Sequence, residues 1–207
     1  MRRRHFLASA PLMLLAAAPA RVHADVVSDA YLLHTLIPGA LLKAVRIWNA
    51  QEDEWRAPRR EELPRLGSAV TVLHFWAHYC APCRQEFPIL RDLAKQIEAL
   101  YGSQVSFVYL CESSSSTDAG RFFASNRQSM PSGPHYQDSG EAIANLLRDN
   151  IPGGQLSLPT TVLLDERLAI RQAVVGSIAP HRGAIAAGIA KLVKLATTEL
   201  LPPSKSR

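Results

Sequence analysis

The chain has 207 residues, of which 23 are lysine or arginine, 18 are aspartate or glutamate, and three are cysteine. Three cysteines are too few for a disulfide scaffold, which usually contains a larger and even number. Beyond position 24 the chain carries 19 basic and 18 acidic side chains, because four arginines precede it: Arg2, Arg3, Arg4 and Arg21. This near balance gives no support for nucleic-acid binding, and we expect no nucleic acid as a partner.

Residues 1–24 have the pattern of an export signal. Three arginines precede an apolar run over residues 6–18, and Val22-His23-Ala24 is an acceptable cleavage site, with Ala18-Pro19-Ala20 as a second one. The paired arginines resemble a twin-arginine signal, and Sec export is the alternative route. The apolar run is shorter than the ~20 residues of a membrane-spanning helix. We therefore expect a removed signal peptide and a periplasmic protein, with a retained N-terminal anchor as the alternative.

Residues 25–66 are predicted to extend a β-sheet. An apolar helix or turn is expected over residues 30–37, followed by a β-hairpin around the polar turn at residues 49–53. Alternation of apolar and polar positions predicts which side chains face inward: Val45, Ile47 and Trp55.

Residues 67–199 are predicted to form one α/β domain, and residues 200–207 a disordered tail. Two buried strands lie about thirty residues apart with helical periodicity between them, which is typical of a right-handed βαβ unit. One strand is predicted to begin at residue 71. Three further strands are predicted at residues 105–110, 160–165 and 170–175. The later helices are predicted at residues 118–126, 143–148 and 180–199. This order indicates a mixed central sheet with helices on both faces.

The segment between the first strand and its helix contains Cys80-Ala-Pro-Cys83. A helix is predicted there because five apolar residues are spaced by three and four: Phe87, Leu90, Ala94, Ile97 and Tyr101. Cys80 would lie at the helix N-terminus, where free N–H groups and the helix dipole lower the pKa of a thiol below its usual ~8.5. Cys83 would lie one turn further on, close enough to close a disulfide. The spacing predicts a thiol–disulfide redox site.

The stretch Trp76-Ala-His-Tyr-Cys80-Ala-Pro-Cys83-Arg-Gln-Glu86-Phe-Pro88 resembles the active-site segment of thioredoxin-like proteins, and among them the exported TlpA/ResA/DsbE-like branch. Leu158-Pro159-Thr160 resembles the segment whose cis-proline faces the disulfide in that fold, and Gly176 resembles a glycine of its last strand. The resemblance covers about residues 30–195. It implies a thioredoxin-like fold with an N-terminal β-hairpin extension.

The resemblance also implies a periplasmic thiol–disulfide oxidoreductase whose only redox group is the Cys80–Cys83 pair, with no further cofactor. We expect a disulfide reductase in which Cys80 is the nucleophile and Cys83 the resolving thiol. Its substrates would be exported proteins with disulfides, for example in cytochrome c maturation, and a membrane thiol transporter would supply reductant. A disulfide-donating oxidase is the first alternative. A metal-delivery or metal-binding module is the second, although scattered histidines and a single C-x-x-C predict no metal site.

Four residues are expected to meet the substrate. A cis bond before Pro159 would leave a backbone edge at Leu158 and Pro159 on which a peptide pairs as a short strand. Trp76 and Tyr79 are expected to flank the site as an apolar landing surface, with a place in the core as the alternative.

Further residues are expected to tune the thiols. The resemblance implies that Ala81 and Pro82 set the reduction potential, and Pro82 also stiffens the turn. His74 would either carry charge and stabilise the Cys80 thiolate or lie neutral in the core. Glu86 is expected to complement the helix dipole near the start of the helix. Cys111 is expected to pack as a small apolar residue, with a regulatory thiol as the alternative.

Overall fold

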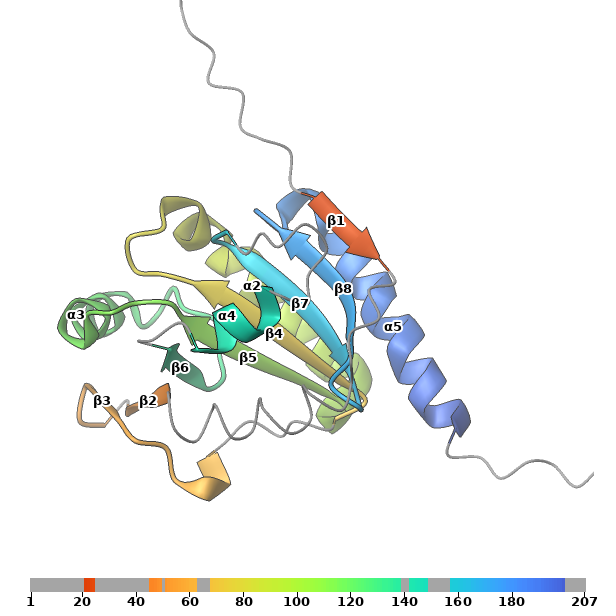
Figure 1. Cartoon of the computed structure of the whole chain (residues 1–207), viewed down its shortest axis with the longest axis horizontal. Coiled ribbons are helices and arrows are strands. Elements are labelled where there is room, and N and C mark those ends of the chain that lie inside the picture. Colours follow the sequence, from red (N-terminus) through yellow and green to blue (C-terminus); the bar gives the residue numbers. More distant parts are fainter. Residues whose placement is uncertain are drawn as a thin grey trace, which may run out of the picture.

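The computed structural model of the protein describes residues 21–24, 45–49, 51–62, 68–138, 142–148 and 157–199. These residues form a mixed eight-stranded sheet with the order β1-β8-β7-β4-β5-β6-β2-β3 (Figure 1). The strands are β1 (Arg21–Ala24), β2 (Val45–Asn49), β3 (Glu54–Arg56), β4 (Val70–Trp76), β5 (Val105–Cys111), β6 (His135–Asp138), β7 (Thr160–Asp165) and β8 (Ile170–Val175). The helices are α2 (Ala81–Tyr101), α3 (Ser116–Asn126), α4 (Ala142–Arg148) and α5 (Arg182–Glu199).

The central strand β4 positions the rest of the fold. It pairs with β5 in parallel and with β7 antiparallel, and all seven of its residues are buried. Because successive side chains of a strand point to opposite faces, Val72 and Trp76 pack with α2, α3 and α5, whereas Leu73 and Phe75 pack with α4. Helices thus cover both faces of the sheet, as predicted.

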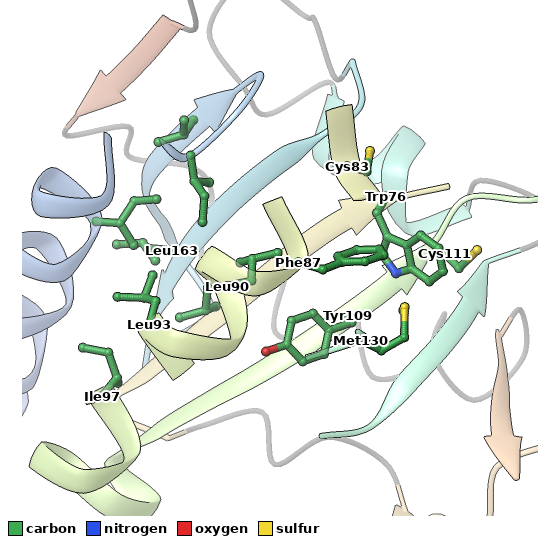
Figure 2. Packing of buried hydrophobic residues seen from close by; sticks show 14 of the residues in the cluster. Trp76, Cys83, Phe87, Leu90, Leu93, Ile97, Tyr109, Cys111, Met130 and Leu163 are labelled. Carbon is green, nitrogen blue, oxygen red and sulfur yellow. The ribbon is translucent and has the colours of Figure 1, made fainter. Parts of the chain in front are cut away.

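The predicted apolar face of α2 lies against the sheet. Phe87, Leu90, Ala94 and Ile97 are all buried, and Tyr101 is half-buried. Figure 2 shows side chains of this face filling the space between α2 and the strands, beside Trp76 and Tyr109. This packing sets the position of the first turn of α2, where the cysteines lie.

The predicted hairpin is confirmed. β2 pairs antiparallel with β3 through Trp48 and Trp55, and its other edge pairs with β6. Val45, Ile47 and Trp55 are buried, as the alternation predicted. The ring of Phe123 on α3 stacks on Trp48 at a centroid distance of 5.0 Å, so the hairpin is packed against the domain.

Most of the predicted element bounds agree with the structure. Strands β7 and β8 have the predicted bounds, and β5 continues one residue further, to Cys111. Strand β6 was not predicted, because its sequence His-Tyr-Gln-Asp is polar although all four residues are buried. The closing helix begins later than predicted, at Arg182, after a 3₁₀ turn at Ala179–His181.

Several predictions concern residues outside the described ones, namely the export signal up to residue 20, the helix or turn at 30–37 and the tail at 200–207. Within the predicted signal, Arg21–Ala24 is described, and it pairs antiparallel with β8 as strand β1. Cleavage after Ala20 would keep this strand, whereas cleavage after Ala24 would remove it. Among the described helices, none combines the length and apolarity that crossing a membrane requires.

Candidate redox site at Cys80 and Cys83

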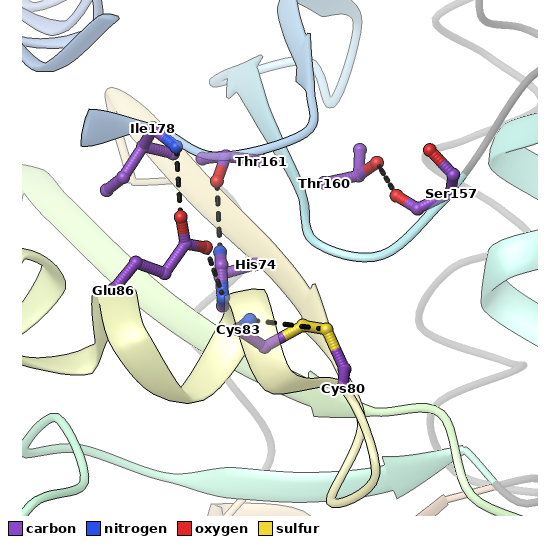
Figure 3. Close-up of a disulfide and its surroundings, with 8 residues drawn as sticks. All are labelled: His74, Cys80, Cys83, Glu86, Ser157, Thr160, Thr161 and Ile178. Atoms are coloured by element: carbon purple, nitrogen blue, oxygen red, sulfur yellow. Dashed lines mark hydrogen bonds and ion pairs between the residues drawn. A yellow bond between two sulfur atoms is a disulfide. The ribbon is translucent and has the colours of Figure 1, made fainter. Parts of the chain in front are cut away.

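Cys80 and Cys83 form a disulfide at the start of α2 (Figure 3). Cys80 is the N-cap residue, with extended backbone angles, and its Sγ accepts a hydrogen bond of 3.2 Å from the N–H of Cys83. A sulfur in this position faces the unpaired N–H groups and the positive end of the helix dipole. The arrangement therefore stabilises a Cys80 thiolate once the disulfide is reduced.

The two sulfurs differ in access. Cys80 is 8% exposed and Cys83 is fully buried. Ala81 and Pro82 between them are exposed and lie in the first turn of α2. Of these two sulfurs, an incoming molecule can therefore reach only that of Cys80, and the sulfur within bonding distance of Cys83 is that of Cys80 itself.

The loop before β7 supplies the expected proline. The Leu158–Pro159 peptide bond is cis, as predicted, and the Pro159 carbonyl accepts a hydrogen bond from the N–H of Gly176 at 2.8 Å. The pairing of Phe75 with Thr160 places this loop at the same end of the sheet as the turn from β4 into α2. Leu158 is half-buried and contacts the hydrophobic clusters on both faces of the sheet.

The structure separates the two aromatic residues that were predicted to form a landing surface. Trp76 is fully buried and packs edge-on against Phe87 at 5.2 Å, so its predicted role at the surface is wrong and it belongs to the core. Tyr79 is 66% exposed, directly before Cys80, and its ring lies 5.1 Å from that of His78. Among these residues, only Tyr79 offers an aromatic surface next to the reachable sulfur.

Glu86 lies near the start of α2, as predicted, but its environment differs from the one expected. It is the sixth residue of α2, and its side chain is buried against the sheet. Its Oε2 accepts a hydrogen bond of 2.9 Å from the N–H of Ile178. Burial raises the pKa of Glu86 to about 7, although hydrogen bonds from Ile178 and the Ser177 side chain oppose this rise.

His74 is a buried residue of β4 that faces Glu86. Its Nδ1 lies 3.0 Å from Oγ1 of Thr161, and its Nε2 lies 3.4 Å from Oε1 of Glu86. Burial, and secondarily the charge of His135, lowers the pKa of His74 to about 3. Of the two alternatives for His74, the neutral core histidine therefore agrees with the structure.

Cys111 ends β5 and is fully buried beside Trp76, its partner in β4. Burial raises the pKa of its thiol, and the charge of Glu112 adds to this rise. It packs as a small apolar residue, as expected. Within the described residues, no three His, Cys, Asp or Glu side chains are grouped around a place for a metal ion.

Sequence reasoning missed three residues that surround the buried pair. Thr161, Ser177 and Ile178 contact His74 or Glu86, and the Thr161 and Ile178 contacts join positions 87 and 92 residues apart. Of these three residues, only Thr161 could have been suspected from the sequence, because it directly follows the predicted cis-proline segment. The fold and this site together define a thioredoxin-like protein with a disulfide between a reachable and a buried cysteine.

Comparisons with known proteins agree with this class. A family model described as thioredoxin-like matches residues 67–169. The thioredoxin-like protein YneN of Bacillus subtilis is 29% identical over 111 residues, which are 52% of this chain and 56% of that relative. The chain thus matches little more than half the length of this curated relative. Residues 67–169 hold both cysteines, α2 and the cis-proline loop, and this part of the chain is a thioredoxin-like domain.

Among solved structures similar to this chain, one with a TM-score above 0.5 shows the same fold. A thioredoxin-like protein from Porphyromonas gingivalis has a TM-score of 0.51 and 16% identity, covering 75% of this chain and 93% of its own. A thiol:disulfide interchange protein DsbE from Chlorobium tepidum has a TM-score of 0.49 and 26% identity, covering 61% of this chain and 82% of its own. The thioredoxin-like fold expected from the sequence is confirmed.

Proposed function

We propose that this protein is an exported thiol–disulfide oxidoreductase that reduces disulfides in other exported proteins. The observation that carries the proposal is the asymmetry of the pair: Cys80 is reachable at a helix N-terminus, and Cys83 is buried behind it. This asymmetry assigns attack on substrate to Cys80 and release of substrate to Cys83.

The reaction begins from the reduced pair. The Cys80 thiolate attacks one sulfur of a substrate disulfide, a Cys80–substrate bond forms, and the other substrate sulfur leaves as a thiolate. Cys83 then loses its proton and attacks the Cys80 sulfur. The Cys80–Cys83 bond forms, the Cys80–substrate bond breaks, and the second substrate thiolate leaves. Two electrons have passed from the cysteine pair to the substrate, which takes up protons from solvent.

Next to the disulfide, the protein offers a peptide substrate a backbone edge and an apolar surface. The residues before β7 present backbone at the same end of the sheet as the disulfide, where an extended peptide pairs as a short strand. Leu158, which is half-buried, would contact its side chains next to the buried Pro159, and the exposed ring of Tyr79, directly before Cys80, would add an aromatic surface. A contact made mainly through backbone hydrogen bonds would favour protein substrates of varied sequence.

The state of His74 favours the reducing direction. A charged imidazole near the cysteines would stabilise the thiolate, and a protein whose reduced form is stabilised becomes a stronger oxidant. Because burial lowers the pKa of His74, that stabilisation is absent at neutral pH. The neighbouring Glu86 carboxyl, when ionised, acts in the opposite sense and disfavours a thiolate.

Each cycle leaves the protein oxidised, so a second dithiol has to return two electrons. We propose that a membrane thiol transporter fills this role, since electrons for an exported reductase come from inside the cell. Exported proteins with disulfides, such as apocytochrome c, are the proposed substrates. The cysteine pair supplies the whole redox chemistry of this proposal.

The reduction potential of the Cys80–Cys83 pair against glutathione tests the direction. A value near the ~−270 mV of thioredoxin is expected, whereas a value near the ~−120 mV of DsbA would overturn the reductase and indicate disulfide donation. Cys83→Ser should accumulate a mixed disulfide with substrate protein, and Cys80→Ser should form none. Cys111→Ser is the matched control, because it removes a buried thiol outside the pair and should leave reduction of substrate intact.

A further inference from the structure

We propose that His78 is the general acid of the first step and that its Nε2 gives a proton to the substrate sulfur that leaves when Cys80 attacks. The inference rests on the proposed function and adds a catalytic residue to it. Three observations support it: the place of His78 in the turn before Cys80, the hydrogen bond that orients its ring, and the access of its outer nitrogen to solvent.

His78 lies in a short turn that ends at the reachable cysteine. The N–H of Cys80 donates to the carbonyl of Ala77 at 3.1 Å, so the chain folds back between these two residues. Two residues of chain span at most about 7 Å, which limits the distance between the Cα atoms of His78 and Cys80. The side chain of His78 therefore starts close to the place where the two substrate sulfurs lie during attack on their disulfide.

The end of β5 holds His78 from the side opposite the cis-proline loop. Strand β4 lies between β7 and β5, so the turn after β4 is flanked by the Pro159 loop on one side and by the residues after β5 on the other (Figure 1). The His78 backbone donates a hydrogen bond to the thiol of Cys111, the last residue of β5. Nδ1 of its ring lies 3.2 Å from Oγ of the buried Ser113. A peptide paired at Pro159 would therefore meet His78 across the disulfide.

The partners of Ser113 decide which ring nitrogen of His78 carries the hydrogen. A hydroxyl has one hydrogen to donate, and that of Ser113 goes to the carbonyl of Ser115 at 3.1 Å. Toward the ring, Oγ can only accept, so Nδ1 of a neutral His78 bears the hydrogen and Nε2 carries the lone pair. Nε2 is therefore the nitrogen that takes a proton from solvent and gives it to a substrate.

The position of the His78 ring leaves Nε2 accessible. The side chain is half-buried, and its ring packs edge-on against that of Tyr79 at a centroid distance of 5.1 Å. Nε2 itself is not buried, and within the described part of the chain it forms no hydrogen bond or ion pair. The ring is thus held on its inner side by Ser113 and Tyr79, while its outer nitrogen faces solvent beside Cys80.

An imidazole suits this role better than the other ionisable groups around the turn. Histidine is the side chain whose ordinary change of charge falls near neutral pH. Among the described neighbours, burial raises the pKa of the Cys111 thiol, and Glu112 is buried beside it. The carboxylate of Asp118 on α3 accepts the hydroxyl hydrogen of Ser115 at 2.8 Å. Residues 157–160 on the β7 side have no ionisable side chain.

The step balances without a further reactant. The Cys80 thiolate attacks one substrate sulfur, the Cys80–sulfur bond forms, and the substrate S–S bond breaks with both of its electrons on the leaving sulfur. That sulfur takes the proton from Nε2 of the imidazolium and departs as a thiol, and the neutral His78 regains a proton from solvent. The transfer matters most for a leaving thiol of high pKa, because such a sulfur leaves slowly as a thiolate.

The test compares two leaving groups in a variant that stops after the first step. In Cys83→Ser the mixed disulfide is not resolved, so release of the leaving group reports attack by Cys80 alone. Dithiobis(nitrobenzoate) releases an aromatic thiolate that needs no proton at neutral pH, whereas oxidised glutathione releases an alkyl thiol that does. Adding His78→Asn should slow the reaction with oxidised glutathione about tenfold or more and change that with the aromatic disulfide by less than about twofold. Both reagents are anionic, so a mere loss of positive charge would slow both.

Two further variants separate proton donation from a structural role. Asparagine at position 78 keeps an N–H that can donate to Ser113, so His78→Asn removes the acid and retains the anchor. Ser113→Ala keeps the imidazole but not its orientation and should slow the reaction with oxidised glutathione about threefold. His181→Asn changes a half-buried histidine before α5 and should alter neither rate. Equal slowing of both reagents in His78→Asn, or no slowing with oxidised glutathione, would overturn the proposal.

A second measurement examines the ring without any reaction. The ¹⁵N signals of the imidazole distinguish a hydrogen on Nδ1 from one on Nε2. We expect neutral His78 to carry it on Nδ1, and Ser113→Ala to shift it toward Nε2. A hydrogen on Nε2 of neutral His78 in the unaltered protein would overturn the proposal. Failure of Cys83→Ser to form a mixed disulfide with either reagent would instead count against the proposed function, whichever nitrogen carries the hydrogen.

Discussion

The carbonyl oxygen of Pro159 accepts a 2.8 Å hydrogen bond from the N–H of Gly176. Pro159 directly precedes β7 and Gly176 directly follows β8, so the bond joins the ends of two paired strands. Gly176 has a φ of 97°, a value that residues with a side chain rarely adopt. The loop beside the disulfide is thus tied to the last strand by a residue that needs to be glycine.

Replacing this glycine should destabilise the fold. Gly176→Ala forces a Cβ into the positive-φ conformation and should lower the free energy of unfolding by about 1–2 kcal/mol, measured by urea denaturation. Gly183→Ala is the control, because Gly183 is exposed on α5 with nothing within 4 Å of an added Cβ. Equal stability of the two variants would contradict the need for glycine at position 176.

A second glycine is required for packing. A Cβ on Gly188 would lie 2.9 Å from Cδ1 of buried Leu163 and 2.3 Å from Oε1 of Gln172. The end of Gln172 can turn away, but Leu163 is held in the core, so Gly188→Ala should lower stability by about 1 kcal/mol after the gain in helix propensity. Gly183→Ala on the same helix should raise stability by about 0.5–1 kcal/mol. Urea denaturation should therefore show a lower midpoint than wild type for Gly188→Ala and a higher one for Gly183→Ala.

The sequence predicted the elements whose signals are local. Strands β7 and β8 are apolar runs bounded by turn residues, and their bounds agree with the structure. The disulfide and the cis-proline followed from two short motifs. Trp76 could also have been placed, because it shares a face of β4 with Val70 and Val72 at a period of two, and those residues are core.

The features that were missed depend on contacts between distant residues. Strand β6 is polar, and its burial is possible because the Gln137 amide donates to the Ser113 carbonyl and the Asp138 carboxylate accepts from the Ile143 N–H. From the sequence, Glu86 resembles an acidic residue that complements the helix dipole, and only the fold shows that it faces His74. Neither environment can be read from neighbouring residues, since a buried polar group is explained only by the partner that tertiary structure brings to it.

The three cysteines should differ in their reaction with iodoacetamide. In the reduced native protein at pH 7, Cys80 should be labelled at least about 100-fold faster than Cys83 or Cys111, because among the three only Cys80 keeps some accessible surface, 8%, and lies at a helix N-terminus that stabilises its thiolate. Burial raises the pKa of Cys111 and leaves almost no thiolate there. Mass spectrometry of digested protein measures each rate. Labelling of Cys111 at the rate of Cys80 in folded protein would contradict its burial.

The buried pair should also shape the dependence of stability on pH. The pKa of Glu86 is raised from its ordinary 4.5 to about 7 by folding, so its contribution to stability is complete below pH 4.5 and is lost as pH rises through 7. The pKa of His74 is lowered from 6.5 to about 3, so its contribution is present above pH 6.5 and is lost as pH falls toward 3. Between pH 4.5 and 6.5 the two slopes oppose each other.

Replacing either Glu86 or His74 should reveal how the other residue alone makes stability depend on pH. Relative to wild type, Glu86→Gln should become more stable as pH rises from 4.5 to 8, by about 3 kcal/mol in total, because the variant has no carboxyl to ionise in the core. His74→Asn should become less stable relative to wild type as pH rises from 3 to 6.5, since the histidine contribution is missing. Urea unfolding at half-unit pH steps measures both differences. As a control, the difference in unfolding free energy between Glu98→Gln and wild type should not change with pH. If the difference for Glu86→Gln also stayed constant, Glu86 would be shown to ionise freely in the folded protein.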